Sequence, residues 1–217
     1  MSLLSVRDLS LSASESSLVG PLSFELKAGE KLGIIGESGS GKSLTALSIM
    51  GLLPSGIAAA GEITVADHQI VGARDAAIRP LRGKTMSMVF QEPMSALDPL
   101  MRISAQLTHA GARDIVAALE EVDLDADLAS RFPHQLSGGQ RQRVLLAMAM
   151  AGSPDVLICD EPTTALDATT QDGVLRVIER VTEQHGTALL FISHDLNVIQ
   201  RMCPRVLVMR DGHIVEE

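Results

Sequence analysis

Apolar and polar positions alternate along this chain with two different periods. Short apolar runs bounded by Gly and Pro are typical of strands, and apolar residues three or four positions apart are typical of helices. The pattern predicts several short strands over residues 3–35, with turns at 19–21 and 28–30 and a buried strand that ends at Ile34 and Ile35. Further strands are predicted at 61–65, 85–90, 156–159, 188–192 and 205–209.

Helical spacing starts at Gly41 and stops at Gly51 and Pro54, and it returns over 169–184, where Gly186 could end the helix. Between about 92 and 151 the strand signals vanish and helical patches dominate, including 115–122 and 144–150. Strands that alternate with helices imply an α/β fold with a mostly parallel sheet and helices on both faces. The region 92–151 is then a helical insertion.

Size and composition limit the possible functions. With 217 residues, 46% hydrophobic and 21% charged, the chain is typical of an ordinary globular protein. A net charge of -9 argues against nucleic acid as a partner, because that affinity comes mainly from Lys and Arg. The two cysteines, Cys159 and Cys203, fit a reducing compartment and have no metal-ligand spacing. No signal peptide or membrane-spanning stretch is expected, so the predicted location is the cytoplasm.

The stretch GESGSGKS follows the predicted strand that ends at Ile35 and precedes a helix, which is the context of a phosphate-binding loop. Glycines let successive N–H groups point inward, around phosphate oxygens at the positive end of a helix. Lys42 would reach the β- and γ-phosphates, and the Ser43 hydroxyl would bind Mg²⁺. A glycine-rich hairpin or a plain helix start is the alternative. The predicted nucleotide-binding residues are Gly36, Glu37, Ser38, Gly39, Ser40, Gly41, Lys42, Ser43 and Leu44.

The apolar strand VLIC ends in two acids, Asp160 and Glu161. Ligands of open α/β sheets bind at the carboxyl ends of the strands, so these acids should emerge beside the phosphate loop. Neighbouring strand residues face opposite sides, which suggests different tasks. We assign Asp160 to the Mg²⁺ shell and Glu161 to the attacking water as general base. A solvated acidic turn before Pro162 is the alternative.

The segment LSGGQ precedes a good helix, and Ser137 and Gln140 fit a capping box. A capping box does not need two glycines, however, and two glycines with a serine at a helix N-terminus make a second anion site. One chain with two such half-sites suggests that two copies close around nucleotide. This second site comprises Leu136, Ser137, Gly138, Gly139 and Gln140.

In that order, GESGSGKS, LSGGQ, VLICDEP and FISHD resemble the nucleotide-binding subunit of an ATP-binding-cassette (ABC) transporter. The resemblance covers nearly the whole chain. It implies a P-loop NTPase (RecA-like) core, an antiparallel β portion near the N-terminus and an inserted helical subdomain. It also implies one ATPase domain over 1–217, with a core subdomain of about 1–91 and 152–217 and a helical subdomain of about 92–151.

The resemblance also assigns roles and partners. Gln91 matches the glutamine that touches Mg²⁺ and the attacking water, and His194 matches the histidine that contacts the γ-phosphate. Ala165, Leu166 and Asp167 match the D-loop, which crosses the dimer interface. The implied cofactors are ATP and Mg²⁺. The implied partners are a second nucleotide-binding subunit, in a homodimer or a heterodimer, and transmembrane permease subunits. The implied location is the cytoplasm, peripherally on the inner face of the cell membrane.

A narrower likeness links LRGKTMSMVFQEPMSALDPLMRI, RFPHQLSGGQRQRV and DEPTTALDATTQ to ATPases of oligopeptide, dipeptide and nickel importers. It implies an importer for peptides, nickel or a related small solute, supplied indirectly by a solute-binding protein. An ABC ATPase that acts on ribosomes or DNA is the alternative.

The sequence departs from this family at three places. Residues 9–18 contain no aromatic side chain to stack on adenine, the helical insertion from 105 to 131 is short, and the chain stops at Glu217, where that subgroup continues. We therefore expect that adenine binds more weakly or that another residue replaces the missing aromatic side chain. We also expect that the chain is either a shortened form or a compact variant of the subgroup.

Overall fold

A six-stranded sheet forms the centre of the computed structural model, which describes residues 2–14, 16–91, 96–164 and 166–217. The strand order is β10-β9-β3-β8-β7-β6, and only the edge pair β10-β9 is antiparallel in this sheet, as far as the described residues show. The predicted mostly parallel sheet is confirmed, and edge strand β10 is an addition to it. The bounds are β3 Lys31–Gly36, β6 Met86–Val89, β7 Val156–Asp160, β8 Ala188–Ser193, β9 Arg205–Arg210 and β10 His213–Glu216.

A second, antiparallel sheet has the order β2-β1-β4-β5. The prediction of short strands is wrong for β1 and β2, which are 12 residues each, because register shifts let a long strand bend without ending. Gly20, predicted to mark a turn, lies inside β2 with φ 98°, and a Cβ there would come within 2.0 Å of the Leu9 carbonyl oxygen. The bounds are β1 Ser2–Ala13, β2 Ser16–Lys27, β4 Ile57–Val65 and β5 His68–Gln69.

The helices lie mostly where the apolar spacing predicts them. Helix α7 ends at Gly186, whose φ of 65° is the left-handed conformation expected of a C-terminal glycine. Helix α5 ends two residues before the predicted 122, although Val122 is fully buried in the following turn. The α-helices are α1 Lys42–Ile49, α2 Asp75–Ile78, α4 Ile103–Ala110, α5 Ile115–Glu120, α6 Gly138–Met150, α7 Ala168–His185 and α8 Leu196–Met202. The 3₁₀ turns are η1 Arg79–Leu81, η2 Ala126–Ser130 and η3 Pro133–Gln135.

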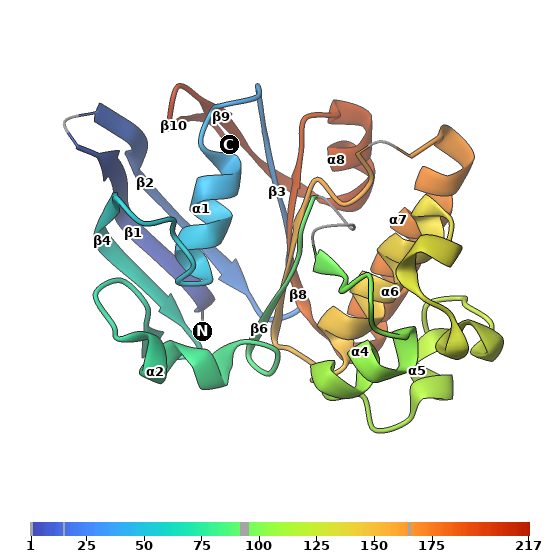
Figure 1. Cartoon of the computed structure of the whole chain (residues 1–217). Helices are drawn as coiled ribbons and strands as arrows, with labels where there is room; N and C mark the ends of the chain where they lie inside the picture. Colours follow the sequence, from blue (N-terminus) through green and yellow to red (C-terminus); the bar gives the residue numbers. More distant parts are fainter. Residues whose placement is uncertain (1, 15, 92–95, 165) are drawn as a thin grey trace.

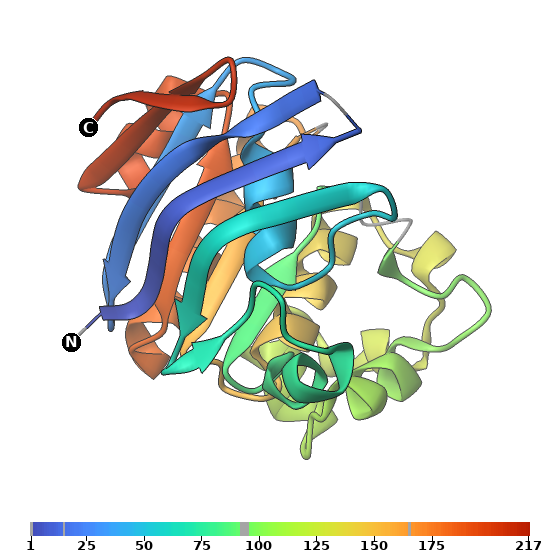
Figure 2. The ribbon, with the colours of Figure 1, turned by 90° about the vertical axis from the view of Figure 1, so that its left-hand side faces the viewer.

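The two faces of the central sheet belong to two separate apolar clusters. In β7, Leu157 and Cys159 join the cluster that includes α6, α7 and α8, while Val156 and Ile158 join the cluster that includes α1 and the antiparallel sheet. Figure 1 shows α1 between the two sheets, α2 at the lower end of the antiparallel sheet, and α4, α5, α6, α7 and α8 on the other side of the central sheet. Figure 2 shows the antiparallel sheet as an outer layer. Helices therefore cover both faces, but on one face a β layer covers the helix in turn.

Every regular element that the structure describes between residues 96 and 150 is helical. Helix α6 contacts both α7 and β6, which connects this helical region to the central sheet. Arg180 of α7 adds polar contacts, since its guanidinium lies 2.9 Å from the Asp123 carboxylate and donates to the Glu121 carbonyl at 2.7 Å. The helical region is thus packed on the core through one long helix and one edge strand.

Within the described ranges, none of the helices has both the length and the apolar character needed to cross a bilayer.

Candidate functional site

The loop GESGSGKS lies at the carboxyl end of β3 and leads into α1. Gly41 caps α1 with φ 97°, and a Cβ there would lie 2.4 Å from Val19 Cγ2, so the loop can press against β2 only because this residue is glycine. No side chain caps α1 at this position. The first N–H groups of the helix therefore face the loop.

The Lys42 side chain curls into this loop. Its ammonium donates hydrogen bonds to the carbonyl oxygens of Gly36 at 2.8 Å and Glu37 at 2.9 Å, and the residue is only 5% exposed. A lysine ammonium has three donors, so a third N–H is left to reach a ligand. The positive charge is held where phosphates would enter.

Asp160 ends β7 beside the loop and is buried. Burial raises the pKa of this carboxyl above its ordinary value, the Glu161 charge raises it further, and a hydrogen bond from Ser43 and the Lys42 charge oppose the rise. Its Oδ1 has no hydrogen-bond partner among the described residues. An unsatisfied buried carboxylate oxygen beside a hydroxyl is a suitable pair of hard oxygen ligands for Mg²⁺, which binds through one or two carboxylates plus phosphates.

Glu161 follows Asp160 and stands at the centre of a hydrogen-bonded cluster. Its Oε2 accepts from Gln91 Nε2 at 3.3 Å, from Thr164 Oγ1 at 2.9 Å and from His194 Nδ1 at 3.0 Å. The backbone has a φ of 47°, and its N–H donates to the Ile192 carbonyl at 2.9 Å. The cluster joins the ends of β6, β7 and β8, where an α/β sheet is expected to bind its ligand.

Residues of the phosphate loop and of the Glu161 cluster line one cavity of about 470 Å³. It gathers most of the predicted nucleotide-binding and catalytic residues, whereas Gly36, Glu37, Ser40 and Asp160 do not line it. Sequence reasoning missed Thr164, although Glu-Pro-Thr-Thr has Pro at the second position of a turn and thereby predicts that the first and fourth residues meet. The lining residues are Ser38, Gly39, Gly41, Lys42, Ser43, Leu44, Gln91, Glu161, Thr164 and His194.

The LSGGQ segment starts α6 and makes the full capping box. Ser137 Oγ accepts from the Gln140 N–H at 3.3 Å, and Gln140 Oε1 accepts from the Ser137 N–H at 2.9 Å. Ser137 and Gly138 are exposed and Gly139 is buried. Within the described ranges, no residue of this segment lines the cavity above.

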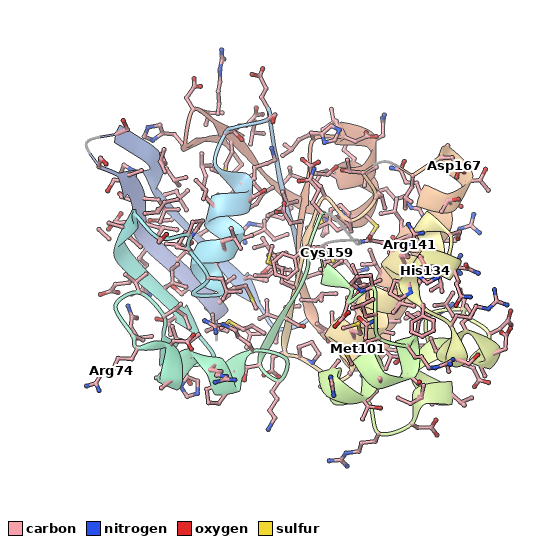
Figure 3. All side chains as sticks on the ribbon, viewed as in Figure 1. Arg74, Met101, His134, Arg141, Cys159 and Asp167 are labelled. Carbon is pink, nitrogen blue, oxygen red and sulfur yellow. The ribbon has the colours of Figure 1, made fainter. Side chains whose placement is uncertain are left out.

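Of the three D-loop residues, Ala165 lies outside the described residues. Leu166 packs against the helical cluster, and Asp167 caps α7, as Figure 3 shows at the upper end of that helix. The Asp167 carboxylate accepts from Thr170 Oγ1 at 2.6 Å and from the N–H groups of Thr169 and Thr170. The Thr170 hydrogen bonds are the main reason why the pKa of Asp167 is lowered.

Proteins of similar sequence are named as ATP-binding proteins of transporters. The chain is 43% identical to the probable peptide ABC transporter ATP-binding protein y4tR of Sinorhizobium fredii, over 99% of this chain and 70% of that protein. It is 40% identical to the oligopeptide transport ATP-binding protein OppD of Salmonella typhimurium, over 99% of this chain and 69% of that one. For the peptidoglycan transport ATP-binding protein YejF of Agrobacterium fabrum the identity is 42%, but this chain spans only 43% of that protein's length.

Solved structures of similar fold are also nucleotide-binding cassettes. The ATP-binding cassette MJ0796, described as dimeric and bound to ADP and Pi, superposes with a TM-score of 0.83 and 27% identity, over 98% of this chain and 97% of that one. CbiO1 of Clostridium perfringens superposes with a TM-score of 0.85 and 26% identity, over 99% and 87% of the two chains. A profile of the ABC transporter family matches residues 19–164. The chain therefore belongs to the ABC transporter family and has the fold of its ATP-binding cassettes.

Proposed function

We propose that this protein is the ATP-hydrolysing subunit of an ABC importer for peptides. The observation that carries the proposal is one cavity in which the phosphate loop, Gln91, Glu161 and His194 converge from distant parts of the sequence. The names of the relatives support a peptide as the solute. Nickel stays a prediction from sequence resemblance alone.

In this proposal the loop binds the triphosphate of ATP. The N–H groups at the start of α1 surround the phosphate oxygens, and Lys42 exchanges its hydrogen bonds with the Gly36 and Glu37 carbonyls for the β- and γ-phosphates. Glu37 and Ser40 shape the loop, while Ser38, Gly39 and Leu44 line the cavity. The affinity then comes mainly from the phosphates, and the base contributes less.

Ser43, Asp160 and Gln91 are proposed to hold Mg²⁺, which when bound would neutralise charge on the β- and γ-phosphates. Two observations support this assignment: the buried Asp160 Oδ1 has no hydrogen-bond partner among the described residues, and the neighbouring Ser43 hydroxyl lowers the pKa of the same carboxyl. Among the described residues, no group of three or more His, Cys, Asp and Glu side chains is arranged to hold a metal ion by itself. Such a site therefore depends on phosphate oxygens for its remaining ligands.

Glu161 is proposed as the general base. It takes a proton from water while the water oxygen bonds to the γ-phosphorus and the bond to the bridging oxygen of ADP breaks, which leaves ADP and phosphate. His194 and Gln91 both lie within hydrogen-bonding distance of its carboxylate and line the cavity, so they can also contact the γ-phosphate and the water. The four residues assigned to catalysis are thus Lys42, Gln91, Glu161 and His194.

A second cassette is proposed to complete each site. The exposed Ser137 and Gly138 would approach the phosphates bound to the other copy, with Leu136, Gly139 and Gln140 supporting them. The D-loop Ala165, Leu166 and Asp167 would cross the same interface. The dimeric form of the MJ0796 cassette supports this arrangement. Because nucleotide then touches both copies only when they are closed, ATP favours the closed dimer and hydrolysis releases it.

The remaining partners are proposed from the importer relatives. Transmembrane permease subunits would receive the closing motion, and a solute-binding protein would deliver the peptide to them. The protein would then sit in the cytoplasm, peripherally on the inner face of the membrane. We also propose one domain, with a core subdomain of about 1–91 and 152–217 and a helical subdomain of about 92–151. No relative reported above is named for work on ribosomes or DNA.

The proposal is tested by purifying the protein with permease subunits encoded beside its gene and placing the complex in lipid vesicles. We expect ATP-dependent phosphate release that rises when the partner binding protein and a short peptide are added. A Lys84→Ala variant serves as a control, because this exposed lysine lies outside the cavity. Phosphate release that ignores the peptide and its binding protein would contradict the importer assignment.

A further inference from the structure

We infer that Thr164 is a positioning residue for Glu161: its hydroxyl fixes one carboxylate oxygen, so that the other is presented to the attacking water. The inference rests on the proposed function, in which Glu161 is the base. The sequence patterns assign no role to this residue, and its hydroxyl reaches the carboxylate at 2.9 Å within the cavity.

The local backbone brings Thr164 to this place. The Thr164 N–H donates to the Glu161 carbonyl at 3.2 Å, which closes a four-residue turn with Pro162 at its second position. Proline presets the backbone for that position of a turn. The turn folds the fourth side chain back onto the first, so the hydrogen bond between hydroxyl and carboxylate is short-range and needs no distant element.

The two oxygens of the Glu161 carboxylate have different surroundings. Three donors converge on Oε2, whereas Oε1 accepts no hydrogen bond from any residue that the structure describes. The Glu161 side chain is only 13% exposed, whereas its three donors are exposed residues that line the cavity. A carboxylate held through one oxygen keeps the other available in a fixed direction, as a base requires.

Thr164 makes the shortest of the three contacts, at 2.9 Å, and is an exposed residue like the other two donors. The His194 side chain is 59% exposed, and Gln91 has three rotatable bonds and a longer contact of 3.3 Å. A β-branched threonine has a stiff χ1 and loses little rotamer freedom when its hydroxyl binds. Thr164 therefore holds the carboxylate while the other two side chains contact nucleotide.

The test compares four variants in steady-state ATP hydrolysis, with ATP affinity measured by titration calorimetry. Thr164→Val keeps the shape but removes the donor, and Thr164→Ser keeps the donor. We expect Thr164→Val to lower kcat about tenfold with KM and Kd within about twofold, since it removes one support of a base step worth about 10²–10⁴-fold. Thr164→Ser should retain kcat within about threefold. Thr64→Val is the matched control, because it removes a hydroxyl that bonds another side chain, Gln69, on the outer sheet; its kcat and KM should equal those of the unaltered protein.

An unchanged kcat in Thr164→Val, or equal losses in the Val and Ser variants, would overturn the inference. If Thr164→Val does not fold, Thr164→Ala is compared with Thr164→Ser instead. A lower kcat in Thr164→Ala alone supports the inference, and equal kcat values in the two variants contradict it. The fourth variant, Glu161→Gln, separates the two claims. If Glu161→Gln hydrolyses ATP at the full rate, the assignment of Glu161 as the base is wrong. If Glu161→Gln is inactive while Thr164→Val is fully active, only the positioning role of Thr164 is contradicted.

Discussion

Gly139 of α6 packs so closely on Thr170 of α7 that a Cβ on the glycine would lie 2.3 Å from Thr170 Cγ2. Thr170 has little freedom to move away, because its hydroxyl donates to the Asp167 carboxylate at 2.6 Å. Gly138 has more room, with its nearest contact 3.2 Å away at Leu166 Cδ2. The packing of α6 on α7 therefore favours glycine at position 139, independently of any contact between LSGGQ and nucleotide.

The first prediction follows from this contact. Alanine normally stabilises a helix over glycine, but Gly139→Ala should lower the free energy of unfolding by about 1–3 kcal/mol, because it overpacks the junction of α6 and α7. Gly173→Ala is the control, since a Cβ there meets nothing within 4 Å. It should raise the free energy of unfolding by about 0.5–1 kcal/mol. Urea denaturation measures both, and a Gly139→Ala variant as stable as the unaltered protein would refute the packing argument.

The second prediction concerns pH and the cap of α7. The pKa of Asp167 is lowered in the folded protein, first by the hydrogen bonds from Thr170. A carboxylate with a depressed folded-state pKa stabilises the fold above its unfolded pKa and loses that contribution as pH falls through the folded value. Asp167→Asn should thus be less stable than the unaltered protein at pH 7, with a gap that shrinks below about pH 4.

Denaturation midpoints at pH 7 and pH 3 measure that gap. Asp67→Asn is the matched control, because Asp67 is an exposed aspartate in a turn outside any helix cap. It should show a smaller difference from the unaltered protein at both pH values. A gap for Asp167→Asn that stays constant from pH 7 to pH 3 would be inconsistent with a charged cap.

Local patterns in the sequence predicted the parts of the site that are themselves local. The phosphate loop lies between β3 and α1, and Asp160 ends a buried strand, because strand, turn and helix signals there agree with one another. The family resemblance, not periodicity, supplied Gln91 and His194. Their meeting at Glu161 depends on β6, β7 and β8 being neighbours in the sheet, which apolar spacing does not encode.

The parts that sequence reasoning missed depend on irregular backbone or on tertiary contacts. Strand β1 continues through register shifts near Asp8, whose φ is 47°, and such bulges have no apolar period. Gly20 looks like a turn residue, but it serves a close approach to Leu9. Thr164 is an exception, because the turn that joins it to Glu161 is local; a threonine in a turn does not by itself predict that its hydroxyl supports a base.

The third prediction tests the second copy. Ser137→Arg places a long cation on an exposed helix start, where the proposed partner would bring its ATP and loop. We expect this variant to remain monomeric on a sizing column with ATP in the Glu161→Gln background, which should accumulate the closed dimer. Ser137→Ala is the control, because it removes only the Ser137 hydroxyl from the capping box and leaves space for the partner. A normal dimer peak for Ser137→Arg would exclude this surface from the interface.

The fourth prediction concerns the ammonium in the phosphate loop. Lys42→Ala should weaken ATP binding about 10–100-fold, because charge-assisted hydrogen bonds are worth about 1.5–3 kcal/mol. Lys84→Ala changes the net charge equally at an exposed position and should bind ATP normally. Titration calorimetry measures both, and equal dissociation constants for the two variants would count against a role for Lys42.

The most direct test of the whole account is phosphate release by the purified protein and its Glu161→Gln variant, with ATP binding measured on the same samples. Glutamine keeps the size of the side chain but cannot take a proton from water. We predict steady phosphate release by the unaltered protein and a rate at least about 100-fold lower in the variant. The ATP dissociation constant of the variant should be equal to or lower than that of the unaltered protein. Equal phosphate release by both proteins, or none by the unaltered one with magnesium and ATP, would contradict it.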